Sequence, residues 1–294
     1  MMTSLKGETN HKMILWRVAL LLILMGLLAL SIDDLTHYAN IPTVALTLAP
    51  LGLIALTVKL MGKQSPLPAI DALALPVGIF LAGAGLTQIF QSLTDLVAIP
   101  IVTAILVMPA IYVGVIAGVI HCWRGQKTET SIKISTPATA VCLCVLLLLV
   151  IITYADHLSH FTDRGDIWLL QAGIIIALAL GRSPEAGIAK SLCNASLVSI
   201  MIMTILGIIE LTLAGQKTSF SDLTQYMYAI NTAYTAMTAG LVAYMASIII
   251  SFKTGELEEL QLPTKNWHLI EAFSFLIFIT LAPPSIYHFL DVAP

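Results

Sequence analysis

Charged residues are scarce in this sequence. Lysine, arginine, aspartate and glutamate make up 11% of its 294 residues, whereas a soluble domain carries about 25%. Apolar residues make up 58%, and the mean hydropathy is +0.92. So few charges exclude an ordinary soluble domain and predict an all-α membrane protein that crosses the bilayer several times. No basic run suggests a nucleic-acid partner.

Cysteine is also rare, and its four positions lack the spacing of a metal or redox site. Cys142 and Cys144 are separated by one residue, and all four cysteines lie in or beside apolar segments. The seven histidines are scattered, with no pair at one depth of two helices. The sequence has no phosphate-binding glycine loop and no nucleophile paired with a base. We therefore expect no metal, no cofactor and no enzymatic activity.

Long apolar segments account for most of the chain. About 20 helical residues cross the hydrocarbon core of a bilayer, which is about 30 Å thick. Nine such spans can be drawn, at approximately 13–32, 41–61, 70–91, 97–121, 137–155, 166–181, 191–214, 223–252 and 267–289. The sequence therefore predicts nine transmembrane helices and leaves no room for a soluble domain.

The basic residues give the expected orientation. With the N-terminus in the cytoplasm, twelve of the 14 lysines and arginines fall on the inner side, and only Arg164 and Lys217 fall outside. This excess is the positive-inside pattern. We expect the N-terminus inside and, after nine spans, the C-terminus outside. The cytoplasmic segments would include the tail 1–12, the linker 123–137 and the acidic loop 253–266.

The two halves of the chain resemble each other at a nearly constant offset of 122 to 126 residues. An even number of spans gives both halves the same orientation, so we expect two parallel four-helix repeats, 13–122 and 138–252, followed by a ninth helix within 267–294. The alternative is that apolar helices of equal length align by composition alone. The aligned pairs are Gly85 with Gly207, Gln88 with Glu210, Gly114 with Gly240, and Ala19–Leu28 with Val145–Tyr154.

Polar residues inside the apolar segments are the candidate functional residues. Five of them form one helix face, which we call the polar stripe, because they recur at spacings of 4, 3, 4 and 3. The stripe either lines a hydrated path or joins helices by hydrogen bonds. Its members are Thr224, Tyr228, Asn231, Thr235 and Thr238.

Two further polar side chains lie at matching places in the two halves. Glu210 is a carboxylate at membrane depth, which is costly, so we expect it to face protein or water. It either holds a proton in an ion path or is a structural carboxyl hydrogen-bonded to Tyr228 or Asn231. Gln88 is its counterpart, and we expect it to bond across helices rather than conduct.

Short motifs in the segments 191–214 and 223–252 carry a family resemblance. The first segment contains Thr204-Ile205-Leu206-Gly207, and the second contains Thr235 and Thr238 followed by Gly240-Leu241-Val242-Ala243. These elements resemble the core of the MotA/TolQ/ExbB family, the ion-conducting subunits of bacterial membrane motors. The segment Trp168–Ala186 is similar to the second helix of the MotA branch. The family's proline after the second element is missing, and Met237 stands where a hydroxyl is expected.

The resemblance implies a protein of the bacterial inner membrane that couples proton or cation flow to a single-helix partner carrying a membrane aspartate. It also implies assembly into a homo-oligomer surrounded by lipid. Two alternatives stay open: a secondary transporter that binds a small molecule between the repeats, and a non-conducting structural subunit of a membrane complex. The candidate ion-path residues are Glu210, Thr204, Asn231, Thr235, Thr238 and Gln88.

Overall fold

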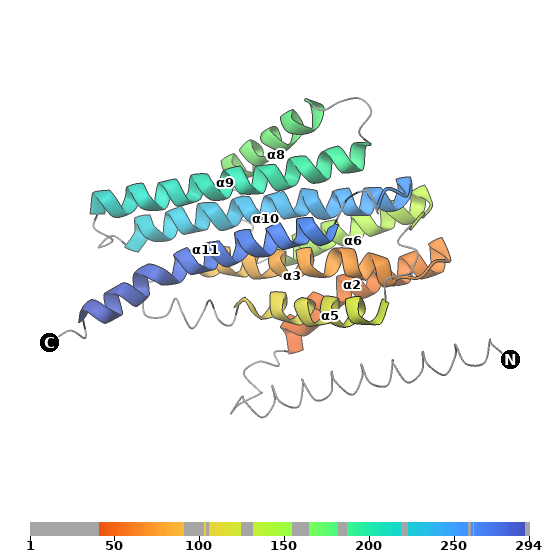
Figure 1. The fold of residues 1–294 in the computed structure, drawn as a ribbon, viewed down its shortest axis with the longest axis horizontal. Coiled ribbons are helices and arrows are strands. Elements are labelled where there is room, and N and C mark those ends of the chain that lie inside the picture. Colours follow the sequence, from red (N-terminus) through yellow and green to blue (C-terminus); the bar gives the residue numbers. More distant parts are fainter. Residues whose placement is uncertain are drawn as a thin grey trace.

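The computed structural model describes residues 41–90, 103, 106–124, 132–154, 165–181, 187–218, 223–257, 260 and 262–291. These residues form eight helices and no strand, and the longest helices run side by side (Figure 1). The helices are α2 (Ile41–Gly62), α3 (Leu67–Phe90), α5 (Met108–Arg124), α6 (Thr136–Tyr154), α8 (Gly165–Leu180), α9 (Ile188–Thr218), α10 (Leu223–Thr254) and α11 (Leu262–Asp291).

Five of these helices contain a segment that is long and apolar enough to cross a membrane. The segments are Thr43–Gly62, Leu67–Gln88, Thr136–Tyr154, Ile188–Glu210 and Ile230–Thr254. The chain is therefore a multi-pass helical membrane protein. The count of nine spans stays a prediction, because 13–32 lies outside the described residues. In addition, the apolar parts described for α5 and α8 are shorter, at Met108–Ala117 and Asp166–Leu180.

Most helix positions agree with the predicted spans to within a few residues. The helices α2, α6 and α8 begin and end within one residue of the predicted spans 41–61, 137–155 and 166–181. The helix α9 extends beyond the predicted 191–214 at both ends, because the polar residues that flank the apolar run include no proline to stop a helix. Within the predicted span 97–121, the continuous helix α5 begins at Met108, and the described positions 103 and 106 before it are also helical.

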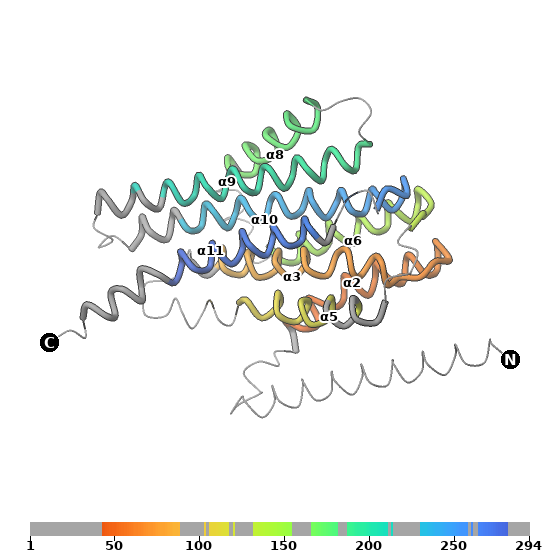
Figure 2. The backbone as a smooth tube through the Cα atoms, viewed as in Figure 1, coloured from red at the N-terminus to blue at the C-terminus, as the bar shows by residue number. Residues whose placement is uncertain are grey.

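The helix α10 is the centre of the described bundle. It packs against α9 on one side and α3 on another, and it also contacts α6, α8 and α11. Figure 2 shows α9 and α10 as a long antiparallel pair, with α3 lying along α10. The apolar segments of α3 and α10 are each 78% buried, against 28% for α6. The core therefore lies between α10 and α3.

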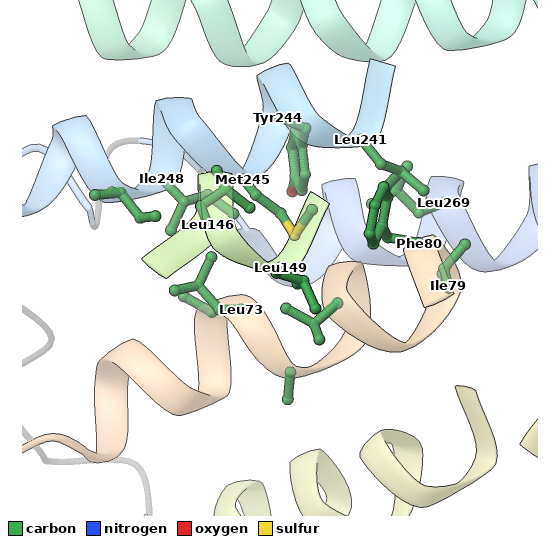
Figure 3. Close-up of a cluster of buried hydrophobic side chains, with 14 of the residues drawn as sticks. Leu73, Ile79, Phe80, Leu146, Leu149, Leu241, Tyr244, Met245, Ile248 and Leu269 are labelled. Atoms are coloured by element: carbon green, nitrogen blue, oxygen red, sulfur yellow. The ribbon is translucent and has the colours of Figure 1, made fainter. Parts of the chain in front are cut away.

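A cluster of apolar side chains joins four of the helices (Figure 3). All the labelled members are at most 5% exposed. Burial from several helices fixes how α10 is rotated about its axis, and this rotation decides where its polar residues point. The labelled members are Leu73, Ile79 and Phe80 of α3, Leu146 and Leu149 of α6, Leu241, Tyr244, Met245 and Ile248 of α10, and Leu269 of α11.

Glycines allow close approach between helices at two places on α10. A Cβ added to Gly83 of α3 would lie 2.9 Å from Thr238 Cγ2 of α10. A Cβ added to Gly207 of α9 would collide with Ala233 of α10. Small residues allow helices in a membrane to pack at this range, where dispersion contacts are strongest. The helix α10 is thus held closely by α3 and by α9.

Candidate functional site

The described part of the polar stripe lies in the protein interior. Asn231 and Thr235 are each 2% exposed, and Thr238 is fully buried. Thr235 Oγ1 donates to Asn231 Oδ1 at 3.3 Å, and Thr238 Oγ1 donates to the Thr235 carbonyl at 2.9 Å. The side chains of Thr224 and Tyr228, which continue the stripe, lie outside the described part. The three described residues therefore form a hydrogen-bonded row along α10.

The polar stripe faces α6 and α3. Tyr154 OH of α6 donates to Thr238 Oγ1 at 3.2 Å, and Gly83 of α3 lies beside the Thr238 methyl group. Gln88 of α3 donates from Nε2 to the carbonyl of Thr153, at 2.6 Å. Thr153 and Tyr154, which are neighbours at the end of α6, thus form hydrogen bonds to α3 and α10 respectively. This region is a polar junction of three helices.

The stripe does not face α9. The residues of α10 that meet α9 include Ala233, beside Gly207, and Gly240, beside Ile200. Gly240 and Thr238 are two residues apart, so they point about 160° away from each other around the helix. The contact between α9 and α10, which we call the α9–α10 seam, therefore lies on the opposite side of α10 from the polar stripe.

The two candidate residues on α9 occupy different environments. Thr204 is 4% exposed, and its hydroxyl has no hydrogen-bond partner within the described structure. Glu210 is exposed. Neither is brought together with Asn231, Thr235 or Thr238, because those residues lie on the far side of α10. The six candidate residues hence do not form one continuous site in this chain.

Gln171 of α8 is a candidate residue that no sequence pattern had indicated. Gln171 is 1% exposed, and neither its Oε1 nor its Nε2 has a hydrogen-bond partner in the described part of the chain. Ser199 of α9 is also fully buried with an unpartnered hydroxyl. A signal was available, since Gln171 is the only amide in the apolar run from Trp168 to Leu180.

Two further hydrogen bonds join α11 to α10. The hydroxyls of Tyr234 and Thr280 lie 3.1 Å apart, and Tyr244 OH donates to Asn266 Oδ1 at 3.1 Å. Thr280 is fully buried. These bonds fix α11 against the centre of the bundle, so the ninth predicted span belongs to the same packed unit as α10.

Metal ligands do not gather in the part of the chain that the structure describes: no three histidine, cysteine or acidic side chains there are placed to share an ion. Cys142, Cys144 and Cys193 are free thiols. No family model, curated protein or solved structure matches the chain. The class of protein therefore rests on the fold, which is that of a multi-pass helical membrane protein with a polar junction and a separate glycine-lined seam.

Proposed function

We propose that this chain is a bacterial inner-membrane protein of the MotA/TolQ/ExbB type, which couples proton or cation flow to a single-helix partner. In this proposal the chain has nine spans, a cytoplasmic N-terminus and two parallel repeats. It forms homo-oligomers, and the partner supplies a membrane aspartate. The helix pair α9 and α10 is the conducting unit.

The observation that carries the proposal is the meeting of the two motif elements at one helix seam. Gly207 ends the Thr204-x-x-Gly207 element and packs directly against Ala233 of α10. Gly240 begins the Gly-Leu-x-x-Ala element and packs against Ile200 of α9. One glycine of each element that resembles the family thus lies at the contact between α9 and α10, while Thr235 and Thr238 of the second element lie on the side that faces α3 and α6. If the resemblance of the two motif elements to the family were due to chance, the two glycines would have no reason to lie at the same helix contact.

The unpartnered hydroxyl of Thr204 and the exposure of Glu210 also support this proposal. A threonine in a helix ordinarily bonds to the carbonyl four residues earlier, as Thr87 does with Gly83 at 2.8 Å. Thr204 is buried without such a bond within the described structure. Glu210 is exposed on the surface of this chain, where a partner helix or a second copy can reach it. Thr204 therefore retains unused hydrogen-bonding capacity, and Glu210 is accessible from outside this chain.

A second candidate function is a non-conducting structural subunit, and the polar junction favours it. Every described hydroxyl of the stripe is bonded within the protein, and Thr238 both donates and accepts. The bond from Tyr154 joins α6 to α10, and hydroxyls that bond between membrane helices serve to hold those helices together. In this alternative the chain organises a membrane complex without passing ions.

Proton uptake into vesicles tests the two functions. The full chain, with whatever small membrane protein purifies with it, is reconstituted around a pH-sensitive dye under an imposed membrane potential. We expect uptake that falls to the level of empty vesicles in Thr204→Val and Glu210→Gln. The matched controls are Thr57→Val and Glu271→Gln, which change the same residue types on α2 and α11 and should leave uptake intact.

Two results decide against conduction through α9. Uptake that is unchanged in both Thr204→Val and Glu210→Gln contradicts the proposed path. A stable complex with a partner but no uptake in any preparation supports the structural subunit instead.

A further inference from the structure

The side-chain amide of Gln171 is buried without the hydrogen-bond partners that such a group needs. Its side chain is 1% exposed, and both polar atoms lack a hydrogen-bond partner in the described structure. An amide offers two N–H donors and one carbonyl acceptor. Buried polar groups in proteins are almost always bonded to protein or to ordered water. The helices around Gln171 use their backbone groups internally, so the partner must come from elsewhere.

Three helices meet in layers around this residue. Ile167 of α8, Met203 of α9 and Ala236 of α10 form one buried cluster. One helical turn further along, Gln171 follows Ile167 on α8, and Gly240 follows Ala236 on α10. Ser199 lies one turn from Met203 on α9, in the same direction because α9 is antiparallel to α10 (Figure 2). The layer after the apolar cluster therefore consists of Gln171, Ser199 and Gly240.

The contacts of Gly240 support this layer. A Cβ added to Gly240 would lie 2.8 Å from Gln171 Nε2 and would collide with Ile200, the neighbour of Ser199. The amide of Gln171 thus lies directly over the glycine, between α9 and α10. Ser199 is fully buried, and its hydroxyl is also unpartnered within the described residues. Helical spacing places Ser199 in the same layer as Gln171, so we infer that the two unpartnered groups lie in one region between α8, α9 and α10.

We propose that Gln171 and Ser199 hold bound water between α8, α9 and α10. A buried water typically makes two to four hydrogen bonds to groups that are otherwise unsatisfied. The amide oxygen, the amide nitrogen and the serine hydroxyl supply three such groups. Gly240 matters because any side chain there would occupy the place of the amide. This site is separate from the polar stripe, and it does not depend on whether the chain conducts ions.

The site lies near the exposed start of α8. The helix has 16 residues, which span about 24 Å, less than the roughly 30 Å of a bilayer core. Asp166 near its start is exposed. Gln171 is five residues from Asp166, about 7.5 Å along the axis. Water at the Asp166 end of α8 therefore lies within two helical turns of the amide.

Hydroxyl-radical footprinting by X-ray radiolysis tests the proposal, because radicals formed from trapped water oxidise the side chains beside it. Met203 is 3% exposed and lies in the layer next to Gln171 and Ser199. Met245 is fully buried among apolar side chains (Figure 3) and serves as the internal control. In the full chain in detergent we expect Met203 to be oxidised several-fold faster than Met245. In the variant Gln171→Leu, whose new side chain has nearly the same shape, the oxidation rate of Met203 should fall to that of Met245.

The opposite outcomes overturn the water site. Equal oxidation of Met203 and Met245 in the unchanged protein means that the seam is dry, and so does fast oxidation of Met203 that persists in Gln171→Leu. If Gln171→Leu does not fold, Ser199→Ala replaces it with the same readout and the same two outcomes. A melting temperature that rises in Gln171→Leu together with unchanged oxidation also contradicts the proposal, since it marks the amide as unsatisfied.

Discussion

Tyr154, the last residue of α6, donates a hydrogen bond of 3.2 Å from its hydroxyl to Thr238 Oγ1 in α10. Its ring packs edge-on against Phe80 of α3 at 6.4 Å and against Trp168 of α8 at 6.1 Å between ring centroids. One tyrosine therefore contacts three other helices, α10 through its hydroxyl and α3 and α8 through its ring.

Removal of that hydroxyl should weaken the bundle. Tyr154→Phe keeps the ring contacts and removes the bond to Thr238, so we expect a loss of about 1 kcal/mol in the free energy of unfolding. Thr238→Val should cost a similar amount. Because the two side chains share one bond, the double variant should lose less than the sum of the single losses. Reversible unfolding in mixed micelles measures each value.

A distant pair provides the control for this cycle. Thr139 is also on α6 and bonds locally to the Ser135 carbonyl at 3.2 Å. It lies about 22 Å along the helix from Tyr154. Tyr154→Phe and Thr139→Val should therefore have additive effects. Additive losses for Tyr154→Phe with Thr238→Val as well would show that the hydroxyls are not coupled.

Even a methyl side chain at Gly207 should lower the stability of the protein, because it disturbs the α9–α10 seam. A Cβ at this position overlaps Ala233, so Gly207→Ala forces the helices apart, and overpacking of this kind costs about 1–3 kcal/mol. The matched control is Gly173→Ala on α8, where a Cβ has open space. Alanine there should leave stability unchanged or raise it slightly, because it restricts the unfolded chain. Thermal unfolding in detergent compares the two, and equal melting temperatures would contradict the seam.

The expected orientation can be checked with single cysteines in a chain whose native cysteines are replaced. Lys253→Cys lies at the inner end of α10 and Asp166→Cys at the outer end of α8 in the predicted topology, and both positions are exposed. A membrane-impermeant maleimide added to intact cells should label Asp166→Cys and not Lys253→Cys. Permeabilisation should expose the second site. Labelling of Lys253→Cys in intact cells would reverse the predicted orientation.

The positions of the helices could be predicted from sequence because burial in a bilayer requires apolar runs of a fixed minimum length. The predicted spans 41–61 and 137–155 therefore match α2 and α6 almost residue for residue. The extensions of α9 could not be predicted in this way, since Gln216 and Lys217 are polar but remain compatible with helix. Hydropathy locates the membrane part of a helix, and the backbone itself decides where the helix ends.

The direction of each polar side chain was harder to predict. The spacing of Asn231, Thr235 and Thr238 correctly indicated a shared face, but it could not indicate which helix this face meets. That choice depends on tertiary contacts, here Gly83 against Thr238 and Gly207 against Ala233. Gln171 was missed for a related reason: a lone amide in an apolar run has no spacing pattern, and only packing shows that it is buried.

The proposed single-helix partner can be tested most directly by purification. The tagged full chain is extracted in a mild detergent, and every protein that remains bound is identified by mass spectrometry. We expect a small protein with one N-terminal transmembrane helix and an aspartate inside it, present at a fixed ratio to the chain. The same ratio should persist at increasing detergent concentration, as specific binding requires. A chain that purifies without any such protein would contradict the proposed coupling function.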